Sequence, residues 1–151
     1  MAYLIDTNIL MRTVEVQSPM RESAKNAIAL LLDAGEQLCT VSQVISEFWN
    51  GCTRPVKNNG LGMTVAEVEA EVLSIESFIT ILPDSPMVYP EWRRLVLKHS
   101  VIGKQVHDAR MAAAMIAHGI KNIVTFNDSD FKRYKAISAF TPSAIISTYT
   151  K

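Results

Sequence analysis

Short continuous apolar runs alternate along the chain with longer segments in which apolar residues recur every three or four positions. The short runs are typical of buried strands, and the longer period is typical of helices with one apolar face. The predicted strands cover residues 3–5, 38–41, 78–82, 123–125 and 137–140. The predicted helices lie between them.

Local signals indicate where several of these helices begin and end. Ser18-Pro19 and Ser85-Pro86 each offer a hydroxyl N-cap followed by proline at the first helical position. Thr64 and Glu67 have the spacing of a capping box, and Gly35 is expected just past a helix end. The predicted helices run over 9–14, from 18 to 35, from 42 to 54, from 64 along an apolar stripe that starts at Val65, from 85, over 106–118 and over 142–148.

Strands that alternate with helices predict an α/β fold with a mostly parallel sheet covered on both faces. The alanine-rich helix over 106–118 has little side-chain bulk and is expected to pack closely on that sheet. A length of 151 residues predicts one domain, residues 1–151, with a core large enough to need no staples.

Composition narrows the class of protein but not its partner. Fifteen basic and fifteen acidic residues balance, so bulk charge does not identify a nucleic-acid or membrane partner. Cys39 and Cys52 lie in apolar segments, as small buried side chains do in a reducing compartment. No basic leader and no apolar run of membrane-spanning length is present. We therefore expect a cytoplasmic protein with no membrane association.

Four acidic positions are expected to meet at one edge of the sheet. Asp6 follows the first strand, Glu47 lies in the helix after the second, Asp108 lies near a helix start, and Asp128 or Asp130 follows a late strand. Ligands bind at the carboxyl ends of strands in such sheets. Like charges ~4 Å apart repel by about 4 kcal/mol at an effective dielectric near 20. Binding of a hard cation such as Mg²⁺ would explain why these acids are grouped.

Taken singly, each acid also has a purely structural interpretation. Asp108 would favour a helix N-terminus, and Asp128 or Asp130 would favour a turn. Glu47 has mainly apolar neighbours and needs a partner, a proton or exposure. The Asn8 amide and the Thr7 hydroxyl would tie the turn after the first strand to nearby backbone.

Four motifs in order resemble one family over nearly the whole chain. They are Leu4-Ile5-Asp6-Thr7-Asn8, Ser42 with Glu47 five residues later, His107-Asp108-Ala109 at the start of the alanine-rich helix, and Thr125-Phe126-Asn127 followed by Asp130-Phe131. Together they look like the PIN domain, and more narrowly like the VapC-like toxins of bacterial toxin–antitoxin pairs.

This resemblance implies a three-layer α/β/α sandwich and an endoribonuclease dependent on Mg²⁺ or Mn²⁺. Asp6, Glu47 and Asp108 fall on the family's first three acidic positions, and the fourth falls on Asn127, with Asp128 and Asp130 close by. Either Asn127 binds the metal through its carbonyl or Asp130 supplies the charge at this position. The residues implied to orient or support the ligands and their waters are Thr7, Asn8, Ser42 and Thr125. Relatives of this kind also imply an RNA substrate, a homodimer and a small antitoxin partner.

Basic and aromatic residues extend the hypothesis outward from the acids. The candidate RNA-binding residues are Arg12, Arg54, Lys104 and Arg110, each of which is equally consistent with an ordinary solvated surface. His107 is a weak candidate for a general base, since a metal-activated water does not need one. Trp49, Trp92 and Tyr89 are interpreted as core or interface, with no role in RNA binding.

Other functions fit the sequence less well. A phosphatase of the haloacid dehalogenase type needs a second aspartate two residues after the first, where Asn8 stands. A receiver domain needs paired acids after its first strand. A PIN-like scaffold without metals, or a nuclease acting on DNA, are the alternatives that stay open.

Overall fold

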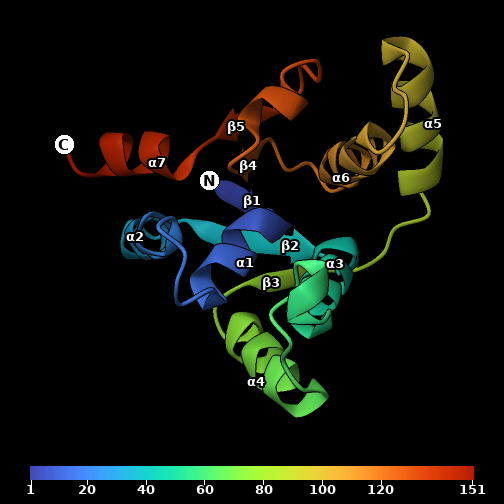
Figure 1. Cartoon of the computed structure of the whole chain (residues 1–151). Helices are drawn as coiled ribbons and strands as arrows, with labels where there is room; N and C mark the ends of the chain where they lie inside the picture. The colour runs from blue at the N-terminus through green and yellow to red at the C-terminus, as the bar shows by residue number, and fades with distance from the viewer.

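The computed structural model describes all 151 residues and contains a five-stranded sheet (Figure 1). The strands are β1 Ala2–Ile5, β2 Gln37–Val41, β3 Thr80–Leu82, β4 Asn122–Val124 and β5 Ser138–Phe140. Their order is β3-β2-β1-β4-β5, and every neighbouring pair is parallel. The predicted α/β class is confirmed, with an all-parallel sheet and β1 at its centre.

Seven helices flank the sheet, with α2 and α7 together at one side and α5 and α6 at the other (Figure 1). They are α1 Thr7–Val14, α2 Arg21–Asp33, α3 Ser42–Thr53, α4 Val65–Glu76, α5 Val88–His99, α6 Gln105–Ala117 and α7 Pro142–Tyr149. Two short 3₁₀ turns, Val56–Asn58 and Asp128–Phe131, complete the elements. No helix is long and apolar enough to span a bilayer.

The sheet and the inner faces of the helices form one apolar core. Leu4 and Ile5 of β1 are fully buried, as Ile123 and Val124 of β4 are. Helix α6 buries its small side chains against the core, as its alanine content predicted. Both cysteines are buried and free, as expected.

The structure corrects four local predictions. At both Ser-Pro pairs the helix begins three residues after the serine, because the serine carbonyl accepts the N–H three residues later and closes a turn, and the first helical bonds are accepted by Met20 and Met87. Val65 is exposed rather than part of the buried stripe. The predicted strand over 78–82 begins only at residue 80, after the turn that follows α4.

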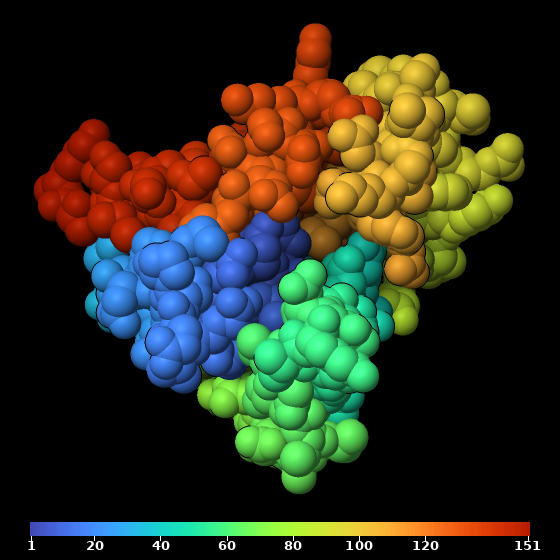
Figure 2. Space-filling view, viewed as in Figure 1, coloured from blue at the N-terminus to red at the C-terminus, as the bar shows by residue number.

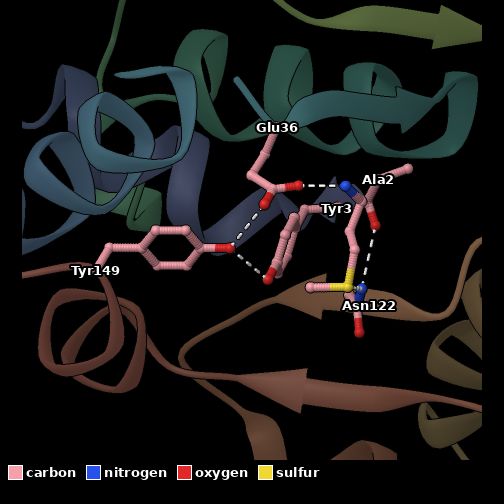
Figure 3. A network of polar contacts seen from close by, with 6 residues as sticks. Ala2, Tyr3, Glu36, Asn122 and Tyr149 are labelled. Atoms are coloured by element: carbon pink, nitrogen blue, oxygen red, sulfur yellow. Dashed lines mark hydrogen bonds and ion pairs between the residues drawn. The ribbon is translucent and has the colours of Figure 1, made fainter. Parts of the chain in front are cut away.

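A polar cluster joins the two ends of the chain at the amino end of β1 (Figure 3). Glu36 accepts hydrogen bonds from the Met1 ammonium and, at 3.1 Å, from the Tyr149 hydroxyl. The hydroxyls of Tyr149 and Tyr3 are 3.0 Å apart. The ammonium holds the pKa of Glu36 below its usual range. This cluster ties α7 to the first strand.

Candidate functional site

Asp6 is fixed at the carboxyl end of the central strand by donors from two directions. Its N–H continues the ladder to Val124 O at 3.1 Å. Its side chain accepts from the Thr7 N–H at 2.7 Å, which caps α1, and from the Thr125 hydroxyl at 2.7 Å. The carboxylate therefore joins the end of β1 to the residue that follows β4.

The Asn8 amide ties the turn after β1 to nearby backbone, as the sequence predicted. Thr125 takes part in the same set of contacts. The Asn8 amide donates to Thr125 Oγ1 at 3.2 Å and accepts from the Phe126 N–H at 3.1 Å. Thr125 Oγ1 also accepts from the Asn127 N–H at 3.0 Å. The loop after β4 is therefore positioned directly on the start of α1.

Burial puts Asp6 under electrostatic strain. Its side chain is only 7% exposed, and desolvation is the main cause that raises its pKa to about 6, although Thr125 and Thr7 lower it. Repulsion from Glu47 and Asp108 raises the pKa further. No cationic side chain pairs with Asp6. Burial and the neighbouring like charges both disfavour the ionised form of this carboxylate.

Glu47 reaches the same place from α3 but stays exposed to solvent. Its Oε1 accepts from the Thr7 hydroxyl at 2.9 Å, so Thr7 bridges to Asp6 through its N–H and to Glu47 through its hydroxyl. Because Glu47 is exposed, its carboxylate needs neither a buried partner nor a proton, although its sequence neighbours are mainly apolar. Glu47 lies on the solvent side of α3, whereas Val44 and Phe48 face the core.

Asp108 and Asp130 form the other side of the acidic group. Asp108 is half-buried in the first turn of α6, and its pKa is raised by desolvation and then by the charges of Asp130 and Glu47. Asp130 is thus electrostatically coupled to the site. Asn127 instead lines the same cleft as Asp6 and Asp108. Both remain candidates for the fourth position, while Asp128 begins the 3₁₀ turn.

A cleft of about 750 Å³ opens over these residues. The face in Figure 2 shows how the early blue segment, the green segment near residue 60 and the orange segments come together around it. Its acidic side is formed by Asp6, Glu47 and Asp108, and its far wall by Arg54 and the loop from Val56 to Leu61.

The far wall is a part of the site that the sequence did not predict, where the segment was assigned only as a loop. The loop is folded back onto the end of α3 by three backbone bonds, from the N–H groups of Leu61, Gly62 and Met63. A Cβ on Gly60 would lie 1.8 Å from the Arg54 carbonyl oxygen, so only glycine fits there. Gly60 and Gly62 were the sequence signal that could have indicated this folded-back loop.

The remaining predicted residues lie at different distances from the acids. The Ser42 hydroxyl donates to Asp84 at 2.5 Å and not to a candidate ligand. Arg12 and Arg54 both line the cleft, but Arg12 is paired with Glu15 at 2.9 Å. Arg110 and His107 line a neighbouring cavity that shares Glu47, and Lys104 is exposed just before α6.

The donor set suits a hard divalent cation. No group of three or more acidic, histidine or cysteine side chains lies close enough together to hold a metal ion. Mg²⁺, however, keeps several waters and usually takes only one or two protein carboxylates. Asp6 and Asp108 supply oxygen donors outside any ion pair at one cleft, and Glu47 and Asn127 supply further oxygens beside them.

Comparison with known proteins gives consistent results. The family model described as the PIN domain matches residues 3–137. VapBC2 from Rickettsia felis, bound to a DNA fragment from its promoter, is similar with a TM-score of 0.69 and 21% identity, covering 93% of this chain and 98% of that chain. A toxin–antitoxin complex from Klebsiella pneumoniae has a TM-score of 0.63 and 22% identity, covering 93% and 97%.

A third similar structure is Mycobacterium tuberculosis VapC20, described as a sarcin–ricin loop cleaving toxin. Its TM-score is 0.64 at 15% identity, covering 87% of this chain and 95% of that chain. At these identities the likeness concerns the fold. No curated protein sequence matches the chain.

Proposed function

The chain belongs to the PIN-domain family, and we propose that it is an endoribonuclease dependent on Mg²⁺ or Mn²⁺. The observation that carries the proposal is the acidic cleft. Asp6, Glu47 and Asp108 line it together, and the pKa values of Asp6 and Asp108 are raised by burial and mutual repulsion. A fold that keeps such charges together outside any ion pair is suited to binding a cation and a phosphate at the same place.

Each residue has a role that follows from its surroundings. Asp6 and Asp108 would hold the cation, with Glu47 and Asn127 or Asp130 beside them. When bound, the cation lowers the pKa of a water and withdraws charge from the phosphate. Thr125 and Thr7 keep the Asp6 oxygens oriented, and Glu47, which is exposed and accepts from the Thr7 hydroxyl, would accept a proton from an attacking water. Hydrolysis would leave a 5′ phosphate and a 3′ hydroxyl.

Partners are part of the same proposal. The chain would act as the toxin of a toxin–antitoxin pair, as a homodimer in the cytoplasm, held inactive by a small antitoxin that covers the cleft. Support comes from the fold shared with a toxin–antitoxin complex over almost the full length of both chains. Sedimentation velocity of the purified chain tests the dimer directly.

The decisive experiment is a titration of cleavage with Mg²⁺ and Mn²⁺ on structured RNA, single-stranded RNA and DNA. We expect metal-dependent cleavage of RNA, and at least a ~1000-fold loss for Asp6→Asn and Asp108→Asn, because each removes a charge from the reacting site. Asp33→Asn, an exposed change at the end of α2, is the matched control. Cleavage of DNA alone would mean that the substrate is DNA and not RNA. No cleavage of any substrate by the wild-type chain would favour the scaffold alternative.

A further inference from the structure

A row of three cavities leads from the acidic cleft to helix α5. The cleft shares Glu47 with a wholly polar cavity of about 500 Å³, which in turn shares Arg110 with a third cavity of about 360 Å³. The third cavity is bordered by the aromatic rings of Tyr89 and Trp92. We call this row, from Glu47 through Arg110 to Tyr89, the Glu47–Tyr89 path.

The helices beneath the path are fastened to one another. Gln43 of α3 donates its side-chain N–H to the His107 carbonyl at 3.1 Å. Trp92 of α5 donates its indole N–H to the adjacent Val106 carbonyl at 2.8 Å. Two neighbouring carbonyls at the start of α6 therefore hold α3 and α5 in place. The three cavities lie over a continuous, hydrogen-bonded base rather than over separate mobile segments.

Charge along the path suits a phosphate chain leaving the acidic cleft. Arg110 is exposed, and none of the three ion pairs of the chain includes it. Arg12 at the opposite end of the cleft is instead neutralised by Glu15. Arg110 is thus a cation outside any ion pair, and it lines the same cavity as Glu47, which has no hydrophobic lining.

Tyr89 provides the surface on which a base can rest. Its side chain is 64% exposed, which rules out the core interpretation made from the sequence. Its ring stacks on Trp92 with centroids 6.2 Å apart and planes at 27°. The indole of Trp92 is fixed by its hydrogen bond, so Tyr89 has a rigid support. Aromatic rings held in this way bind unpaired bases in many single-strand-binding proteins.

We propose that a single nucleic-acid strand follows the Glu47–Tyr89 path, with Arg110 binding a phosphate and Tyr89 stacking on a base. The proposal rests on the nuclease function and specifies its substrate as unpaired, because a base in a duplex offers no free face for stacking. The strand would extend from the reacting phosphate at the acidic cleft toward α5.

Binding measured without divalent ions tests the path separately from cleavage. The probe is a fluorescent single-stranded RNA of mixed sequence, followed by anisotropy in EDTA, with the same sequence as a duplex for comparison. Tyr89→Ala should weaken single-strand binding roughly 5- to 100-fold, while Tyr89→Phe keeps it. Arg110→Ala should weaken binding and reduce the slope of log K against log salt by about 0.7. Lys121→Ala, at the amino end of β4, is the charge control.

Several results would overturn the path. Equal affinity of wild type, Tyr89→Ala and Arg110→Ala for the single strand would do so, as would tighter binding of the duplex. Conversion of a dimer to a monomer by Tyr89→Ala, with binding per protomer unchanged, would assign Tyr89 to an interface between copies instead. If the wild-type chain cleaves no substrate and both variants still lose binding, the result would support the path and contradict the nuclease function.

Discussion

The two ends of strand β1 carry polar clusters of similar make-up in opposite electrostatic states. At the amino end, Glu36 has an ammonium and a tyrosine hydroxyl as partners, and its pKa is lowered. At the carboxyl end, Asp6 has hydrogen-bond donors but no cation, and burial raises its pKa to about 6. A cluster with an ion pair stabilises the fold, whereas a buried carboxylate without a cationic partner costs stability, a state that is common at functional sites.

The largest expected effect is the pH dependence that Asp6 imposes on the metal-free protein. Its pKa is about 6 in the folded state against 3.8 for an ordinary aspartate. The folded state therefore binds more protons between these values, and Asp6 lowers the free energy of unfolding by about 3 kcal/mol as the pH rises from below 4 to above 6. Urea unfolding over a pH series measures this.

Asp6→Asn provides the reference, because the amide does not titrate. The difference in the free energy of unfolding between wild type and Asp6→Asn should change by about 3 kcal/mol across this window. Carboxylates that do not interact with Asp6 contribute equally to both proteins and cancel, whereas the repulsion of Asp6 by Glu47 and Asp108 is part of the measured difference. A difference that stays constant with pH would mean that Asp6 is not strained as described.

The next effect concerns the hydroxyl that holds Asp6. Thr125 is fully buried, and its Oγ1 donates to Asp6 and accepts from the Asn8 amide and the Asn127 N–H. Thr125→Val should lower the free energy of unfolding by about 1–3 kcal/mol, because it leaves buried polar groups without a partner. Cleavage should fall about 10- to 100-fold. Thr125→Ser keeps the hydroxyl and should recover most of both quantities.

The smallest effect is expected at the other cluster. Tyr149→Phe removes the hydroxyl that contacts Glu36 and Tyr3, and should cost about 1 kcal/mol in the free energy of unfolding. Metal affinity and cleavage should not change, because the cluster lies at the opposite end of β1. Chemical denaturation and a cleavage assay on the same preparation measure both. A loss of cleavage matching that of Thr125→Val would show that the two ends are not independent.

The fold was predictable from the sequence wherever short-range patterns determine it. The apolar run before Asp6 predicted the central strand, and Thr64 with Glu67 forms both bonds of the predicted capping box. The Ser-Pro pairs misled, because each serine carbonyl accepts the N–H three residues later and closes a turn, where the pattern predicted the first turn of a helix. Sequence alone does not separate these two geometries.

The site was less predictable, because its contacts join residues far apart in the chain. The bond between Thr125 and Asp6 spans β4 and β1, and Ser42 meets Asp84 only because β2 and β3 are neighbours. The exposure of Tyr89 likewise depends on how α5 lies on α6. The acids themselves were found from their places after strands and at helix starts, which is information the sequence does carry.

The most direct test of the account is the thermal unfolding of wild type, Asp6→Asn and Asp108→Asn with and without Mn²⁺ at pH 7. A cation that binds only the folded state must stabilise it. We predict that saturating Mn²⁺ raises the Tm of the wild type and leaves that of both variants unchanged, while Asp33→Asn responds like the wild type. A wild-type Tm that is insensitive to Mn²⁺ and Mg²⁺ would contradict a cation site built around Asp6 and Asp108.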